Sequence, residues 1–181
     1  MILGIDIGVS GAIALLSPAG ELIDVYDMPC LLDGVRTKAG KNRCTVNAPL
    51  LAELVYKTHA TKAFVERVGP MPKEGAVSAF AFGDCKGVVR GVLAAAAIPC
   101  LFITPAQWKR AVGIPPGKLG AKDQARSEAL RRWPAHAARF KLKKDDGKAE
   151  AALIGLAGLL AFNDVIELVP LANLQAVAGR A

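Results

Sequence analysis

Four acidic residues of this 181-residue chain stand among apolar neighbours, where an ionised side chain is unusual. Asp6 lies inside an apolar run near the amino terminus, and Glu66 ends a second apolar run. Asp146 and Glu150 begin a third apolar stretch, and their spacing places them on one face of a helix. A carboxylate in apolar surroundings is costly unless it is paired or binds a metal. The pattern therefore points to one site that these acids share.

Carboxylates that meet at one site repel one another, and a divalent cation removes that repulsion. Ligand sets made only of oxygen suit Mg²⁺, for which Mn²⁺ is expected to substitute. Two such ions about 3.5–4 Å apart can activate water and stabilise the leaving oxygen of a phosphodiester. We therefore predict that Asp6, Glu66, Asp146 and Glu150 are metal ligands of a hydrolytic site.

Each acid also has a purely structural interpretation. Asp6 could accept hydrogen bonds from the turn that follows it, and Glu66 could pair with Arg67. Asp146 could be a helix N-cap, with Glu150 an exposed acid favoured by the helix dipole. For Asp146 alone the cap and the metal interpretations are equally favoured, whereas for the four acids together the metal interpretation is stronger.

The elements that would position these acids follow from hydrophobic periodicity. An apolar run over residues 1–8 and the segments 12–16 and 21–28 predict three antiparallel strands, and residues 62–67 and 100–103 predict two more. Helices are expected over 47–59, 74–97, 122–133 and 146–162, the second with a break near Gly83 or Gly87. Residues 29–46 read as a basic loop. The order predicts an α/β fold with a mixed five-stranded sheet flanked by helices.

The charge balance favours a polyanionic partner. The chain has 23 lysines and arginines against 16 acids, a formal net charge of +7. Phosphate contacts would supply salt-dependent affinity, although charge runs are more often solvated surfaces. Trp108 and Trp133 are expected in the core rather than stacked on bases. The basic candidates for DNA contact are Arg36, Lys38, Lys41, Arg43, Lys118, Arg126, Lys143, Lys144 and Lys148.

The four cysteines form no C-x-x-C pair, which argues against a zinc site. No signal peptide precedes the first strand, so we expect free thiols and a cytoplasmic location. The longest apolar runs fall short of the roughly 20 residues that span a bilayer, so no membrane association is expected.

Six segments carry a resemblance to a known family when they are taken in order: Ile2–Leu16, Ala63–Val68, Phe82–Ala97, Thr104–Lys109, Gly120–Trp133 and Asp146–Leu156. They resemble the RuvC-like Holliday-junction resolvases. The first segment is similar to the opening hairpin of that family, the second to its strand that ends in a catalytic glutamate, and the last to its final helix with paired acids. The specificity of the resemblance comes from the ordered set of segments.

The resemblance implies an RNase H-like domain over residues 1–162, with 163–181 peripheral. It also implies a homodimer, Mg²⁺ dependence and cleavage of branched DNA in a bacterial or phage-infected cell. By the same resemblance the four acids would be the catalytic metal ligands, and Lys109 and Lys122 would lie near the scissile phosphate.

The sequence departs from the bacterial pattern at two places. The final acids are four residues apart, as in phage-like and mitochondrial relatives, which leaves Asp145 a rival to Asp146 as a ligand. The aromatic residue that follows the glutamate in the bacterial family is missing, and Met71 is at best a substitute wedge into the junction.

The function predicted from the sequence is thus a Mg²⁺-dependent, structure-selective DNA endonuclease that resolves four-way junctions. Three alternatives remain open: a related RNase H-like nuclease on other branched DNA or RNA, a junction-binding protein without catalysis, and an actin-like sugar kinase. The kinases also open with a D-x-G turn, but their two domains need a longer chain.

Overall fold

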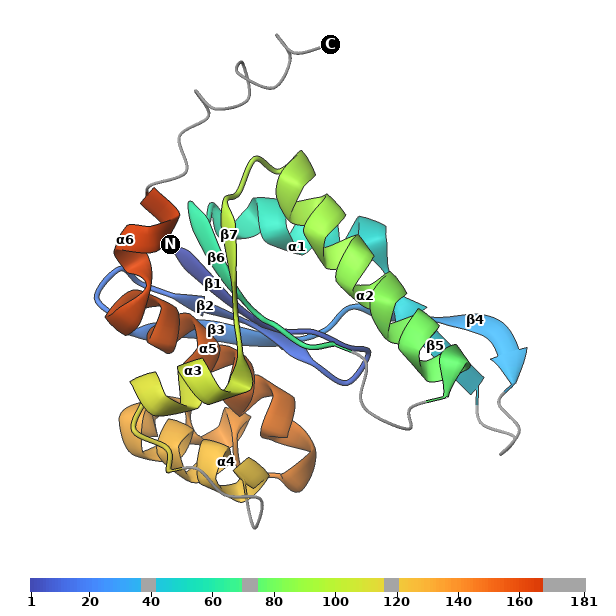
Figure 1. The fold of residues 1–181 in the computed structure, drawn as a ribbon. Helices are drawn as coiled ribbons and strands as arrows, with labels where there is room; N and C mark the ends of the chain where they lie inside the picture. Colours follow the sequence, from blue (N-terminus) through green and yellow to red (C-terminus); the bar gives the residue numbers. More distant parts are fainter. Residues whose placement is uncertain (37–41, 70–74, 116–120, 168–181) are drawn as a thin grey trace, which may run out of the picture.

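The computed structural model describes residues 1–36, 42–69, 75–115 and 121–167; within these ranges the side chains of 33, 35, 36, 42, 121, 122, 166 and 167 are not described. A central sheet separates two groups of helices (Figure 1). The strands are β1 (Ile2–Asp6), β2 (Ala12–Leu16), β3 (Leu22–Asp27), β4 (Cys30–Arg36), β5 (Asn42–Val46), β6 (Lys62–Glu66) and β7 (Cys100–Ile103). The α-helices are α1 (Ala48–Thr58), α2 (Ala76–Ala95), α3 (Pro105–Ala111), α4 (Ala121–Arg132), α5 (Asp146–Ala161) and α6 (Asn163–Glu167). Two 3₁₀ helices, η1 (Pro134–Arg139) and η2 (Lys143–Asp145), join α4 to α5.

The main sheet has five strands in the order β3-β2-β1-β6-β7. β1, β2 and β3 are antiparallel neighbours joined by short turns. β6 runs parallel to β1, and β7 runs parallel to β6. These pairings confirm the predicted mixed sheet with three antiparallel leading strands.

One face of the sheet packs against α1 and α2. Alternate β1 residues, including Leu3 and Ile5, join Leu51 and Val55 of α1 and Val89 of α2 in one buried cluster. Asn47 caps α1 by accepting the Leu50 N–H at 3.2 Å. α2 runs unbroken past Gly83 and Gly87, so the predicted break is wrong. A helix tolerates isolated glycines at a cost of about 1 kcal/mol each.

The other face packs against α5, which is buried along most of its length. A Cβ on Gly4 would clash with the backbone of Ala151 and Gly155, so the helix lies directly on β1. α3 and α4 cover the flank of α5, and Trp108, Trp133 and Phe140 fill the space between them. The sequence prediction that both tryptophans are core residues is confirmed.

The structure corrects the prediction for residues 29–46. β4 and β5 pair as an antiparallel two-stranded ribbon next to α2 rather than forming a loop (Figure 1). The apolar start of β4 and the Cys44-Thr45-Val46 end of β5 have the β-branched and apolar character of strands. The basic residues between these two apolar segments are typical of a loop, and the prediction followed them. No helix in the described part of the chain has the length and apolar character of a membrane span.

Candidate functional site

Asp6 and Glu66 end two neighbouring parallel strands. Ile5 of β1 lies opposite Val65 of β6, so the next residue on each strand is one of the two acids. Side chains alternate along a strand, and the residues two positions earlier, Gly4 and Phe64, face α5. Asp6 and Glu66 are therefore brought together on the face of the sheet that α5 covers.

The first turn of α5 lies against the Asp6 carboxylate. A Cβ placed on Gly147 would be 3.1 Å from Asp6 Oδ2 and 2.8 Å from the Ser10 carbonyl oxygen. Only glycine leaves room for this approach, which explains why Gly147 interrupts the acidic start of the helix. Asp146 precedes Gly147 and Glu150 follows it by three residues, so both predicted acids flank the contact. The positive end of the helix dipole favours negative charge at this position.

Glu66 is held by a partner that the sequence analysis did not assign to it. The indole N–H of Trp108 donates to Glu66 Oε1 at 2.9 Å, and the glutamate side chain is buried. A buried indole N–H generally finds an acceptor, but the sequence does not indicate which one, because the other tryptophan, Trp133, donates to a backbone carbonyl.

The structure distinguishes the environments of Asp145 and Asp146. Asp145 is buried, and its carboxylate accepts the Leu142 N–H at 2.9 Å and lies 3.4 Å from Lys148 Nζ. Asp145 occupies the N-cap position of α5, whereas Asp146 is the first helical residue and is half-buried. The cap interpretation of Asp146 is therefore wrong, and the Asp145 side chain at the N-cap position makes no capping hydrogen bond to α5 either.

The donor chemistry of this region fits a hard divalent cation, because its candidate ligands are all carboxylates. The ends of β1 and β6 and the start of α5 lie on the same face of the main sheet. Gly147 has no side chain, which leaves space beside Asp6. Over the described ranges, no three acidic, histidine or cysteine side chains are arranged to enclose a metal ion. The backbone thus brings the predicted acids near one another without a closed set of ligands.

Lys109 lies on α3, one residue beyond Trp108. Its ammonium group is 5.1 Å from the centroid of the Trp108 ring, a cation–π geometry. Lys122 is the second residue of α4, and its side chain is not described. The structure therefore links Lys109 to the residue that contacts Glu66, whereas the position of the Lys122 side chain stays a prediction.

The predicted DNA contacts have different surroundings. Lys143 and Lys144 are exposed in η2, immediately before α5. Arg126 pairs with Asp123 and donates to the Lys141 carbonyl at 3.3 Å. Lys148 pairs with Asp145 and also with Asp27, at 3.1 Å. Arg43 is half-buried in β5, and Arg36 ends β4 with its side chain not described; Lys38, Lys41, Met71 and Lys118 lie outside the described residues.

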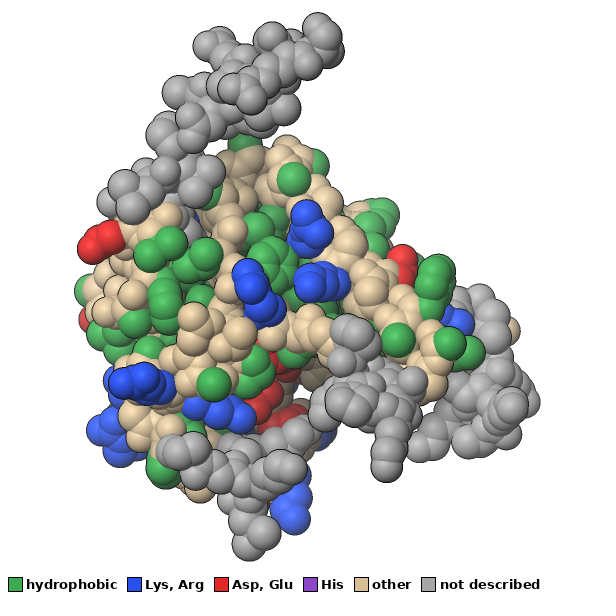
Figure 2. All heavy atoms as spheres, viewed as in Figure 1, with side chains coloured by type: hydrophobic (Ala, Val, Ile, Leu, Met, Phe, Trp, Pro, Cys, Tyr) green, Lys and Arg blue, Asp and Glu red, His purple; other side chains and the backbone are tan. Residues whose placement is uncertain are grey.

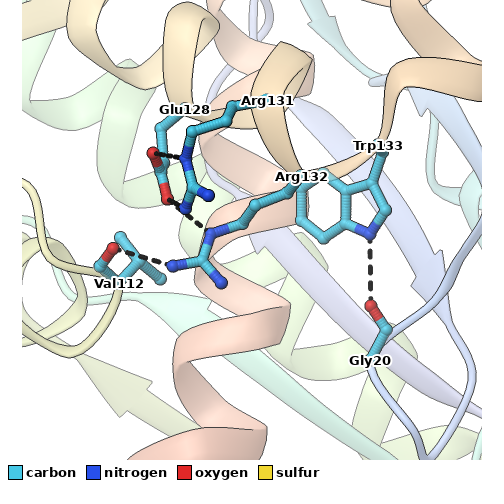
Figure 3. A network of polar contacts seen from close by, with 6 residues as sticks. All are labelled: Gly20, Val112, Glu128, Arg131, Arg132 and Trp133. Atoms are coloured by element: carbon cyan, nitrogen blue, oxygen red, sulfur yellow. Dashed lines mark hydrogen bonds and ion pairs between the residues drawn. The ribbon is translucent and has the colours of Figure 1, made fainter.

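A polar network ties α4 to its neighbours (Figure 3). Glu128 accepts from Arg131 and Arg132, and Arg132 Nη2 donates to the Val112 carbonyl just beyond α3 at 3.0 Å. The Trp133 indole N–H donates to the Gly20 carbonyl in the turn between β2 and β3 at 3.2 Å. The Arg131 hydrogen bond, together with Arg132, lowers the pKa of Glu128 against a smaller opposing effect of burial. The network holds the basic helix against the rest of the molecule.

Acidic side chains lie in a recess beside the α3–α4 part of the molecule (Figure 2). Lysine and arginine side chains are spread over the surface around that recess. An acidic recess within a basic surface matches a metal-dependent site that receives a polyanion.

Two comparisons with solved structures show the fold of the chain. The Thermus thermophilus RuvC in complex with a Holliday-junction substrate superposes with a TM-score of 0.59 and 13% identity, over 91% of this chain and 96% of that chain. A second T. thermophilus RuvC structure gives a TM-score of 0.52 and 14% identity at the same coverage. No protein-family model matches the sequence, and no curated protein matches it. At this identity the likeness establishes the RuvC-like, RNase H-type architecture.

Proposed function

We propose that this chain, on the fold it shares with RuvC, is a divalent-metal-dependent endonuclease that cuts four-way DNA junctions. One observation carries the proposal: the first turn of α5 lies against the Asp6 carboxylate, on the sheet face that also bears Glu66. Segments far apart in the sequence thereby bring acids to one place, as the metal interpretation requires.

In this proposal Asp6, Glu66, Asp146 and Glu150 hold the metal, which would be Mg²⁺ with Mn²⁺ as a substitute. The bound ion would supply a water of lowered pKa and neutralise charge on the phosphate. Lys109, and Lys122 by the same reasoning, would stabilise negative charge that develops on the phosphate. The structural role of Asp145 favours Asp146 as the ligand of the adjacent pair.

The proposed substrate is branched DNA. The solved RuvC relative holds a Holliday-junction substrate, and this chain has a net charge of +7. The exposed Lys143 and Lys144 directly precede the helix that carries Asp146, which suits contacts to phosphates near the site.

A homodimer would place two such sites on a two-fold-symmetric junction. α2 has an outer surface that suits a partner: Val77 and Phe80 are 72% and 76% exposed. Gly83, Gly87 and Gly91 follow at four-residue intervals, and a Cβ on any of them would meet open space. We propose that this α2 surface pairs with the same surface of a second copy, which would cover its apolar residues.

The proposal is tested by incubating the protein with a synthetic four-way junction, a flap, a fork, a linear duplex and an RNA hairpin, each with and without Mg²⁺. We expect paired nicks in the four-way junction only when Mg²⁺ is present. Asp6→Asn should abolish cleavage while junction binding persists. Asp164→Asn is the matched control, because Asp164 is exposed on α6 beyond the opposite end of α5.

Three outcomes contradict the proposal in different ways. Equal cleavage by Asp6→Asn and wild type would show that the proposed site is wrong. Tight junction binding without cleavage in Mg²⁺ or Mn²⁺ would favour the non-catalytic alternative. Cleavage of the RNA or the flap in preference to the junction would favour a related nuclease.

A further inference from the structure

We propose that Trp108 is a positioning residue that orients both Glu66 and Lys109 for the reaction. This inference rests on the proposed function, because it assumes that Glu66 binds the metal. The proposal is based on one observation. The fully buried indole of Trp108 contacts Glu66 through its N–H and Lys109 through its ring face.

The local fold explains why Trp108 reaches Glu66. Glu66 lies opposite Ile103, the last residue of β7. Thr104 follows as the N-cap of α3, with a reciprocal capping box to Gln107 that fixes the start of the helix. One turn later, the N–H of Trp108 bonds the Thr104 carbonyl at 3.0 Å. This arrangement places the Trp108 side chain at the end of β6, where it reaches Glu66.

The hydrogen bond restricts the Glu66 carboxylate. The indole N–H donates to Oε1 at 2.9 Å, in a region where Trp108 is 0% and Glu66 is 8% exposed. A hydrogen bond to a charged acceptor is stronger than one between neutral groups, and burial strengthens it further. The bond engages Oε1 and restricts the orientation of the carboxylate, so in this proposal the second oxygen of Glu66 would be the one that binds a cation.

The same indole also constrains Lys109. Its ammonium group lies 5.1 Å from the ring centroid, and the cation–π attraction favours this position over a fully solvated one. The proposed metal ligand and the proposed phosphate-stabilising lysine are therefore oriented by a single rigid ring.

Trp133 provides the comparison that separates positioning from packing. It too is buried and donates its indole N–H, but to the Gly20 backbone carbonyl (Figure 3). Replacing either tryptophan by phenylalanine keeps an aromatic ring in the core and removes one indole N–H. Only the Trp108 substitution removes a hydrogen bond to a proposed metal ligand.

The first experiment measures Mn²⁺ binding by electron paramagnetic resonance of the free ion, for wild type, Trp108→Phe, Trp133→Phe and Asp6→Asn. We expect Trp108→Phe to raise the Mn²⁺ dissociation constant at least about tenfold, as loss of a partner that orients a metal ligand typically does. Trp133→Phe should bind as wild type does. Junction cleavage by Trp108→Phe should recover in part at high Mn²⁺, which a damaged core would not allow.

The second experiment leaves Trp108 in place. The chain has two tryptophans, so Trp108 is the sole tryptophan in the Trp133→Phe protein. Because the indole contacts Glu66, we expect Mg²⁺ to shift its emission in this protein, and the added substitution Asp6→Asn to remove the shift. This measurement decides the matter even if Trp108→Phe fails to fold.

The outcomes separate the two proposals. If wild type binds no Mn²⁺, the proposed function fails and the role of Trp108 fails with it. If wild type binds Mn²⁺ and Asp6→Asn does not, the metal site stands. Wild-type affinity in Trp108→Phe, or Trp108 emission that ignores Mg²⁺, would then overturn the positioning role alone.

Discussion

Asp145 and Asp146 are neighbours in the sequence, but the first has a structural role and the second is a proposed metal ligand. Asp145 accepts the Leu142 N–H and pairs with Lys148 in a buried setting. We expect Asp145→Asn to lower the free energy of unfolding by roughly 1 kcal/mol, because the amide oxygen can still accept the Leu142 N–H whereas the charge that pairs with Lys148 is lost. Mn²⁺ binding should persist in Asp145→Asn and weaken strongly in Asp146→Asn. Denaturant unfolding and Mn²⁺ titration check both variants, and the reverse pattern would make Asp145 the ligand.

Glu128 contributes to stability in a pH-dependent way. The Arg131 hydrogen bond lowers the pKa of its carboxyl below the ordinary value of 4.5. A carboxyl with a lower pKa in the folded state stabilises the fold above its unfolded pKa. That contribution is lost as the pH falls through the folded pKa. The Glu128→Gln variant should therefore have a lower melting temperature than wild type at pH 7. The difference between the two melting temperatures should become smaller below about pH 4. A difference in melting temperature that is the same at pH 7 and at pH 3 would contradict this role of Glu128.

At the scale of elements, two glycine substitutions should have opposite effects. A Cβ on Gly4 would strike the backbone of α5, whereas a Cβ on Gly87 of α2 would meet open space. We expect Gly4→Ala to cost about 3 kcal/mol or more, because backbone cannot yield as a side chain can. Gly87→Ala should stabilise the monomer by up to about 1 kcal/mol through helix propensity.

Denaturant unfolding measures both effects at low protein concentration. Equal effects of the two substitutions would mean that α5 does not lie directly on β1. If Gly87→Ala instead lowers the free energy of unfolding, and lowers it more at higher protein concentration, the α2 surface is a close-packed contact between copies.

The sheet was predictable because its strands carry period-two and continuous apolar patterns that local sequence displays. The ribbon of β4 and β5 was missed because its basic residues resemble a loop, and pairing between two strands is not a local property. Asp6 and Glu66 were recognisable as acids in apolar runs. The contact of Gly147 with Asp6 and the bond from Trp108 to Glu66 join residues far apart in sequence, which only the packed structure reveals.

At the scale of the whole molecule, the net charge of +7 predicts salt-dependent DNA binding. Replacing both Lys143 and Lys144 with alanine should weaken junction binding and reduce the slope of log affinity against log salt by about 2. Lys57→Ala is the control, because Lys57 is an exposed lysine on α1, on the other face of the sheet. Fluorescence anisotropy at several salt concentrations measures the slopes. Equal slopes for wild type and the double variant would remove these lysines from the interface.

In the proposed site Asp6, Glu66 and the start of α5 hold a divalent cation together. The most direct measurement is anomalous diffraction from crystals grown with Mn²⁺. We expect a Mn²⁺ peak within ligand distance of carboxylate oxygens from Asp6, Glu66 and the first turn of α5. A peak elsewhere, or none there at saturating Mn²⁺, would contradict it.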